Sequence, residues 1–94
     1  MRRAAKIDAN QKEIVAGLRD CGYSVLSLAA VGEGCPDLIV GAAGRNYLIE
    51  VKDGNKSPSR RVLTQDQRKF HATWQGQACV VKDLDEALAC ISCG

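Results

Sequence analysis

The most constraining feature of the sequence is a pair of apolar stretches that contain charged residues and flank a glycine turn. They are residues 36–41 (PDLIVG) and residues 46–52 (NYLIEVK). Short β-branched runs on either side of such a turn predict a β-hairpin. A buried carboxylate or ammonium group costs several kcal/mol unless it is paired, hydrogen-bonded or bound to a metal ion. The charges therefore indicate a functional site, and a metal ion is the compensation that we expect.

Strand geometry predicts which of these charges lie together. Alternate side chains of a strand share one face, so Glu50 and Lys52 are expected to be neighbours. A turn centred on Ala43 and Gly44 would place Asp37 opposite Glu50, with the roots of the two side chains about 5 Å apart. Two carboxylates at that separation can share one cation. The opposite face takes the alternating apolar side chains Tyr47, Ile49 and Val51.

Hydrophobic periodicity along the chain predicts the element order α-β-β-β-α-β-α. A final strand that follows a helical crossover can lie parallel to its neighbour, so we expect an α/β fold with a mixed four-stranded sheet flanked by helices. With 94 residues, the chain is expected to be one domain, residues 1–94. The expected elements are a helix from the capping box Asp8-x-x-Gln11 to Gly22, strands 24–30, 37–41 and 46–52, a helix capped by Thr64 and closed by Gly76, a strand 78–81, and a helix that begins after Asp83.

Composition and the number of cysteines limit the class of protein to which the chain can belong. No apolar stretch approaches the roughly 20 residues that a membrane helix needs, and no secretory signal is visible, so we expect a cytoplasmic protein without a membrane partner. The five cysteines cannot all pair, and we expect them to be reduced. Cys90 and Cys93 have half of a zinc-binding spacing, but no second pair accompanies them. Cys35 is expected to be a packing residue rather than a nucleophile.

Positive charge is concentrated after the second strand of the hairpin. Residues 52–69 contain six basic and two acidic side chains, although the whole chain carries a formal charge of only +2. Clustered basic residues contact phosphates, and the alternative is an ordinary solvated loop. The candidate nucleic-acid contacts are Lys56, Arg60, Arg61, Arg68 and Lys69.

The arrangement of Pro36-Asp37, a hairpin turn and Glu50-x-Lys52 resembles the PD-(D/E)xK nuclease superfamily. The resemblance can be narrowed, because three stretches are similar to the VRR-NUC family of virus-type replication and repair nucleases. It covers nearly the whole chain, and it implies a restriction-endonuclease-like αβββαβ core. The three stretches are residues 34–41 (GCPDLIVG), 47–52 (YLIEVK) and 63–67 (LTQDQ).

The resemblance implies a deoxyribonuclease that depends on Mg²⁺ or Mn²⁺ and needs no organic cofactor. Asp37 and Glu50 would bind the ion together with the backbone carbonyl of Val51. Lys52 would lie beside the attacking water and stabilise the developing negative charge. The family also tends to use a glutamate on the first helix, and Glu13 is the candidate for that role.

Several of these assignments have alternatives. Glu13 could equally be a solvated residue on the helix rim. Gln67 is a candidate catalytic residue on the expected inward stripe of its helix, with Phe70, His71 and Trp74, but it also fits a capping box with Thr64. His71 is expected to be a satisfied core histidine rather than a phosphate contact. Glu50 and Lys52 could form a surface ion pair while Asp37 caps a turn.

The function that we expect is a structure-selective endonuclease that acts on branched DNA such as a Holliday junction. Small members of the family are expected to pair into homodimers, and two sites related by a twofold axis suit a junction with two symmetric strands. The expected setting is DNA repair in a bacterial or phage-infected cytoplasm. A catalytically idle DNA-binding module on the same fold is the alternative from another functional class.

Overall fold

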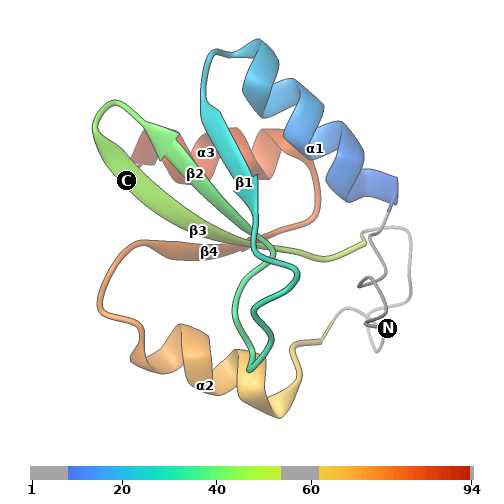
Figure 1. The fold of residues 1–94 in the computed structure, drawn as a ribbon, viewed down its shortest axis with the longest axis vertical. Helices are drawn as coiled ribbons and strands as arrows, with labels where there is room; N and C mark the ends of the chain where they lie inside the picture. Colours follow the sequence, from blue (N-terminus) through green and yellow to red (C-terminus); the bar gives the residue numbers. More distant parts are fainter. Residues whose placement is uncertain (1–8, 54–61, 94) are drawn as a thin grey trace.

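The computed structural model describes residues 9–53 and 62–93, and it has the predicted element order. The first helix is followed by three strands, and then by a helix, a strand and a final helix (Figure 1). The elements are α1 (Ala9–Asp20), β1 (Ser24–Ser27), β2 (Leu38–Ala42), β3 (Arg45–Val51), α2 (Gln65–Thr73), β4 (Ala78–Val81) and α3 (Leu84–Cys93).

The four strands form one mixed sheet in the order β1-β2-β3-β4. β1, β2 and β3 are antiparallel to their neighbours, whereas β4 arrives through α2 and lies parallel to β3. Helices α1 and α3 lie on one side of the sheet and α2 on the other (Figure 1). The predicted α/β class and mixed four-stranded sheet are therefore confirmed.

The hydrophobic core lies between the sheet and the helices α1 and α3. Ile14 and Leu18 of α1 are fully buried, since a spacing of four residues places them on one helix face. Gly17 lets α3 approach α1 closely, because a Cβ atom there would lie 2.4 Å from the Leu84 side chain. The sheet contributes the alternating residues of its inner face to this core, namely Val25, Leu38, Val40, Ala42, Tyr47, Ile49, Val51 and Val81.

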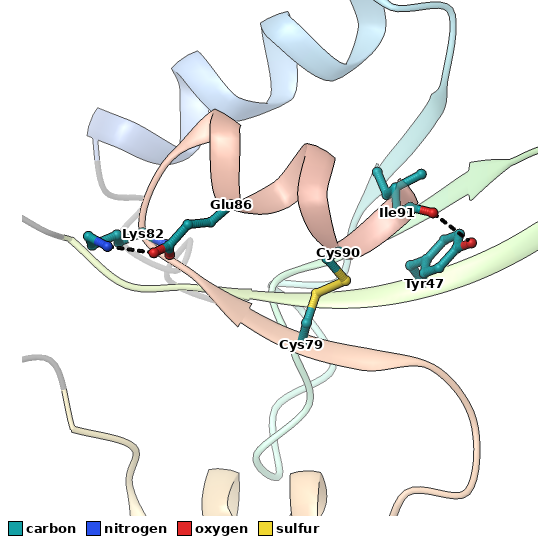
Figure 2. The surroundings of a disulfide bond; sticks show 6 residues. All are labelled: Tyr47, Cys79, Lys82, Glu86, Cys90 and Ile91. Carbon is teal, nitrogen blue, oxygen red and sulfur yellow. Dashed lines mark hydrogen bonds and ion pairs between the residues drawn. A yellow bond between two sulfur atoms is a disulfide. The ribbon is translucent and has the colours of Figure 1, made fainter. Parts of the chain in front are cut away.

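A disulfide joins β4 to α3 (Figure 2), and it corrects the expectation that every cysteine is reduced. Cys79 of β4 is bonded to Cys90, eleven residues later in α3. Nearby, the Tyr47 hydroxyl donates a hydrogen bond to the Ile91 carbonyl at 3.1 Å. Because Cys90 is bonded in the disulfide, its sulfur is not available as a zinc ligand together with Cys93.

Several element boundaries differ from the prediction. β1 ends at Ser27 instead of Ala30, because the chain turns where the Val31 amide donates to the Leu28 carbonyl. α2 ends at Thr73 instead of continuing toward Gly76, since Trp74 already has extended backbone angles. Asp8, the expected cap of the first helix, lies outside the described residues.

The predicted inward stripe of α2 is confirmed for Gln67, Phe70 and His71, which are half-buried while the other residues of α2 are exposed, and it is wrong for Trp74. No residue of α2 is buried, and Trp74 is 48% exposed. Phe70 and Trp74 instead stack on each other, with ring centroids 5.0 Å apart. None of the described helices is long and apolar enough to span a membrane.

Candidate active site

The hairpin of β2 and β3 has the predicted turn and register. Ala43 and Gly44 both have positive φ, as a tight two-residue hairpin turn requires. Leu38 pairs with Ile49, so one further step of this register places Asp37 opposite Glu50. The carboxylates thus come together from adjacent strands at one end of the hairpin.

Asp37 is fixed by the backbone of β3. The Val51 amide donates a hydrogen bond to Oδ2 of Asp37 at 2.7 Å. Val51 itself belongs to the core on the other face of the sheet. The candidate metal-binding residues Asp37, Glu50 and Val51 therefore lie together, and the hydrogen bond from the Val51 amide holds the Asp37 carboxylate in place.

Glu50 is a buried carboxylate with an unmet need for a positive partner. Its residue is 2% exposed, and its Oε1 atom has no hydrogen-bond donor among the described residues. Burial, and then the neighbouring Asp37 carboxyl, raise the pKa of Glu50 from 4.5 to about 8, while the Lys52 charge opposes the rise. Two ionised carboxylates cannot hydrogen-bond to each other, so this pair needs either a proton or a cation between them.

Lys52 and Gln67 complete a polar cluster around Glu50. The Lys52 Nζ atom lies 3.9 Å from Glu50 Oε2 and donates a hydrogen bond to Gln67 Oε1 at 2.9 Å. The Gln67 Nε2 atom donates to Glu50 Oε2 at 3.2 Å. The Gln67 amide therefore bridges the Lys52 ammonium group and the Glu50 carboxylate.

Gln67 also serves as the capping residue of α2, so the two predicted roles coexist. The Thr64 amide donates to Gln67 Oε1, and the Gln67 amide donates to Thr64 Oγ1. This reciprocal pair is the capping box of the helix. The same contacts that begin α2 thus orient the side chain that contacts Glu50 and Lys52.

The loop before Asp37 brings α2 to this end of the sheet. Gly34 has a positive φ of 78°, and a Cβ atom there would lie 2.5 Å from the Asp66 carbonyl oxygen. A side chain at position 34 would push this loop away from α2. Between the loop, α1 and α2 lies a cleft of about 220 Å³, and its lining includes Asp37, Thr64 and Gln67.

Glu13, the predicted glutamate of the first helix, is not brought to this cleft. It is exposed and lines a separate hollow with Asp53 and Lys82, which favours the solvated alternative. The residue of α1 that lines the cleft is Gln11, which is 6% exposed. The sequence could have indicated that Gln11 lies on the buried face of the helix, because it precedes the buried residues Ile14 and Leu18 by three and seven positions.

The remaining candidates are the basic residues expected to contact nucleic acid and His71. Arg68 and Lys69 are exposed on α2, whereas Lys56, Arg60 and Arg61 lie outside the described residues. His71 was expected to be a satisfied core histidine, but its buried Nε2 atom has no partner in the described part of the chain. Burial, and then the Lys52 charge, lower the pKa of His71, so the ring is neutral at pH 7.

Cys35 lines the cleft as a free, half-buried thiol. Burial raises its pKa, and the negative charges of Glu50 and Asp37 raise it further. A thiol with a raised pKa is a poor source of thiolate. Burial and the two neighbouring carboxylates therefore disfavour the thiolate form of Cys35.

The donor set fits a hard divalent cation better than zinc. Among the described residues there is no group of three or more His, Cys, Asp and Glu side chains arranged to hold a metal ion. Asp37 and Glu50 supply two carboxylates, and one Glu50 oxygen is buried without a donor. Mg²⁺ is typically held by one or two carboxylates and keeps several water ligands. The residues present therefore suit Mg²⁺ or Mn²⁺.

Comparison with solved structures identifies the fold. Neither protein-family models nor curated proteins give a match to this chain. A solved structure described as a VRR_NUC domain superposes with a TM-score of 0.64, with 26% sequence identity, over 87% of this chain and 89% of that chain. The chain folds as a VRR-NUC domain. The predicted resemblance to this nuclease family is thus confirmed.

In this VRR-NUC domain the buried Glu50 and three half-buried polar side chains are gathered where the hairpin of β2 and β3 meets α2. Asp37 directly precedes β2, Glu50 and Lys52 lie at the end of β3 and directly after it, and Gln67 belongs to α2, and the four side chains form one connected cluster. These residues are far apart in the sequence, so the fold brings them together, and the capping of α2 by Gln67 does not by itself explain the cluster. The cluster, with the cleft beside it, is the candidate active site.

Proposed function

We propose that this VRR-NUC domain is a DNA endonuclease that depends on Mg²⁺ or Mn²⁺ and hydrolyses phosphodiester bonds. The observation that carries the proposal is the buried, donor-free Oε1 atom of Glu50 beside the Asp37 carboxylate. A buried carboxylate pair of this kind is unfavourable unless a cation compensates it. Asp37 and Glu50, with the Val51 carbonyl, would hold that cation.

The bound ion would supply positive charge to the scissile phosphate and lower the pKa of a water molecule. The protein's own residues have complementary tasks. Lys52 stabilises negative charge that develops on the attacking water and the phosphate, because its ammonium group lies in a partly enclosed position. Gln67 is a positioning residue, since it orients both Lys52 and Glu50 through its amide.

We propose that the substrate is branched DNA, such as a four-way junction, and that the domain acts as a homodimer. Exposed Arg68 and Lys69 on α2 provide phosphate contacts beside the cleft. A homodimer would place two such sites about a twofold axis, as a junction with two symmetric strands requires. Sedimentation analysis should give a dimer, and a monomer at every concentration tested would reject this part of the proposal.

The activity is tested by incubating the protein with end-labelled junction, flap, duplex and single-stranded DNA, with Mn²⁺, Mg²⁺ or EDTA. We expect cleavage of branched DNA only when a divalent ion is present. Lys52→Ala should reduce the cleavage rate by about 100-fold or more, because a charge that stabilises the transition state is lost. DNA affinity should change by less than about threefold, since most of the phosphate contacts remain.

The matched control is Lys12→Ala, which removes an exposed lysine of α1 and changes the net charge equally. This variant should cut at the wild-type rate. If Lys52→Ala also cuts at that rate, the proposed role of Lys52 is wrong. If the wild-type protein binds DNA but does not cut it with any of the divalent ions tested, the domain is a DNA-binding module and not a nuclease.

A further inference from the structure

We propose that Trp74, the residue directly after α2, is a stacking platform for an unpaired DNA base, and that it makes the domain prefer DNA with exposed base faces. This inference rests on the proposed function and deepens it. In an intact duplex the faces of each base are covered by its neighbours, whereas a branch, a flap or a strand end leaves faces open. An exposed aromatic ring distinguishes these two kinds of DNA without reading a sequence, because every base has an aromatic face.

The first observation is the way in which the indole ring of Trp74 is held. The rings of Phe70 and Trp74 are stacked, with centroids 5.0 Å apart and an interplanar angle of 13°. A Cβ atom at Gly76 would lie 2.9 Å from Trp74 Nε1, so the glycine leaves room for the indole. The Trp74 amide donates to the Phe70 carbonyl at 2.9 Å, which ties the residue to the last turn of α2. The ring is therefore in place before a ligand arrives, and a pre-organised side chain loses little entropy on binding.

The second observation is the exposure of this ring within a polar surface. Trp74 is 48% exposed although Phe70 is stacked on its ring. No large apolar side chain of α2 itself is exposed, and α2 is the only described helix on its side of the sheet (Figure 1). A protein partner would be expected to bury a continuous apolar patch. A single ring among polar groups suits a nucleic-acid base better, because a base is a flat ring with polar edges.

The charges of α2 complement a DNA strand that reaches this ring. Arg68 and Lys69 are exposed and precede Trp74 by six and five positions. Basic side chains beside an aromatic ring are the combination that binds single strands, since the cations hold phosphates while the ring stacks a base. A hollow of about 390 Å³ beside the aromatic pair is lined by Glu33, Asp66, Lys69, Phe70 and Thr73. Its two carboxylates repel phosphates, so we place the phosphates on the two basic side chains and the uncharged base on the ring.

The ring lies within reach of the candidate active site along one DNA strand. Gln67, which contacts Glu50 and Lys52, precedes Trp74 by seven positions. A helical rise of about 1.5 Å per residue separates the two positions by about 10 Å along α2. Stacked nucleotides of one strand are about 3.4 Å apart, so an unpaired arm of about six nucleotides spans both places.

The test uses the fluorescence of Trp74, which is the only tryptophan of the chain. The full chain is titrated in EDTA, where no cleavage is expected, with a flap that has a six-nucleotide unpaired arm and with a blunt duplex of the same total length. The flap should quench the Trp74 emission, because a stacked base contacts the indole directly. The duplex should bind through its phosphates and leave the emission unchanged.

Variants of the ring provide a second measurement, by gel shift under the same conditions. Trp74→Ala should weaken binding of the flap by about fivefold or more and binding of the duplex by less than about twofold. Trp74→Phe keeps an aromatic ring and should restore most of the affinity for the flap. The matched control is Gln75→Ala, which changes an exposed neighbour and should leave both affinities unchanged. Circular dichroism of each variant checks the fold, and if Trp74→Ala is unfolded, the wild-type emission and Trp74→Phe decide the question.

The outcomes separate this inference from the nuclease proposal. Unchanged emission on a saturating flap would overturn the inference, as would equal losses of flap and duplex affinity in a folded Trp74→Ala. An emission shift on dilution of the protein without DNA would place the ring in a contact between two copies and would also overturn it. Cleavage with Mn²⁺ but no quenching in EDTA would reject the inference alone, whereas quenching by the flap without cleavage under any divalent ion would reject only the nuclease activity.

Discussion

The sheet face beneath α1 and α3 is packed with apolar side chains, whereas the face toward α2 joins that helix through polar contacts centred on Gln67. The first face buries residues such as Ile49 and Val40 completely. On the second, no residue of α2 is buried, and Glu50 is the enclosed side chain that contacts the helix. Stability therefore resides mainly on one face of the sheet and the candidate chemistry on the other.

This separation explains how the chain can carry an unfavourable carboxylate pair. The apolar core and the disulfide of the first face stabilise the fold without using the residues of the cleft. The cost of burying Glu50 beside Asp37 is then carried by the rest of the fold, as is common at functional sites. The contrast predicts that mutations on the two faces have different effects.

The largest effect on stability is expected when a leucine of the apolar core is replaced, and an exposed leucine of β1 provides the comparison. Leu18→Ala removes a fully buried side chain and should lower the free energy of unfolding by about 3 to 5 kcal/mol. Leu26→Ala removes a side chain that is 67% exposed and should cost less than about 1 kcal/mol. Urea unfolding of both variants measures the difference, and equal losses would contradict the proposed separation of the faces.

The second prediction concerns pH. Because the pKa of Glu50 is raised to about 8, the folded protein holds a proton that the unfolded chain releases near pH 4.5. Without a divalent ion, this group alone should lower the free energy of unfolding between pH 5 and pH 8, by at most about 3 kcal/mol. Added Mn²⁺ should restore stability at pH 8, since it replaces the proton between the carboxylates.

Glu50→Gln separates this effect from the titration of other groups. The amide does not titrate, so the loss of stability between pH 5 and pH 8 should shrink in the variant, as thermal unfolding at each pH will measure. Mn²⁺ should no longer raise its melting temperature. A wild-type pH profile in Glu50→Gln would mean that Glu50 does not hold the proton.

The third and smallest prediction concerns the disulfide. Substituting both Cys79 and Cys90 by serine should lower the free energy of unfolding by about 2 to 3 kcal/mol, because the crosslink closes a short loop. Reducing agent should lower the melting temperature of the wild-type protein and leave the double variant unchanged. DNA cleavage below the melting temperature should be retained, since the crosslink lies between β4 and α3. A selective loss of cleavage would show that the two faces are coupled.

The hairpin could be predicted from the sequence because its rules are local. Alternation along β3 separates Glu50 from Ile49, and the Ala43-Gly44 turn sets the register that brings Asp37 opposite Glu50. Neither inference requires knowledge of a distant contact. For the same reason the capping box of α2 at Thr64 was predictable.

The contacts between distant elements could not be predicted in this way. The disulfide depends on the approach of α3 to β4, which no spacing within either element reveals. Gln11 was missed in favour of Glu13 because a carboxylate was the expected residue type, although the helical phase of Ile14 favours Gln11. Likewise, Trp74 is 48% exposed because α2 ends at Thr73, one residue before it, so the helical pattern does not extend to that side chain.

The central claim is that Asp37 and Glu50 hold a divalent cation. It is tested most directly by a crystal grown at about pH 8 and soaked in Mn²⁺, with anomalous diffraction used to locate the ion. The account predicts an anomalous peak between the two carboxylates, within coordination distance of both, and no peak there in Glu50→Gln. An empty site in the wild-type crystal, with the two carboxyl groups joined by a proton, would contradict it.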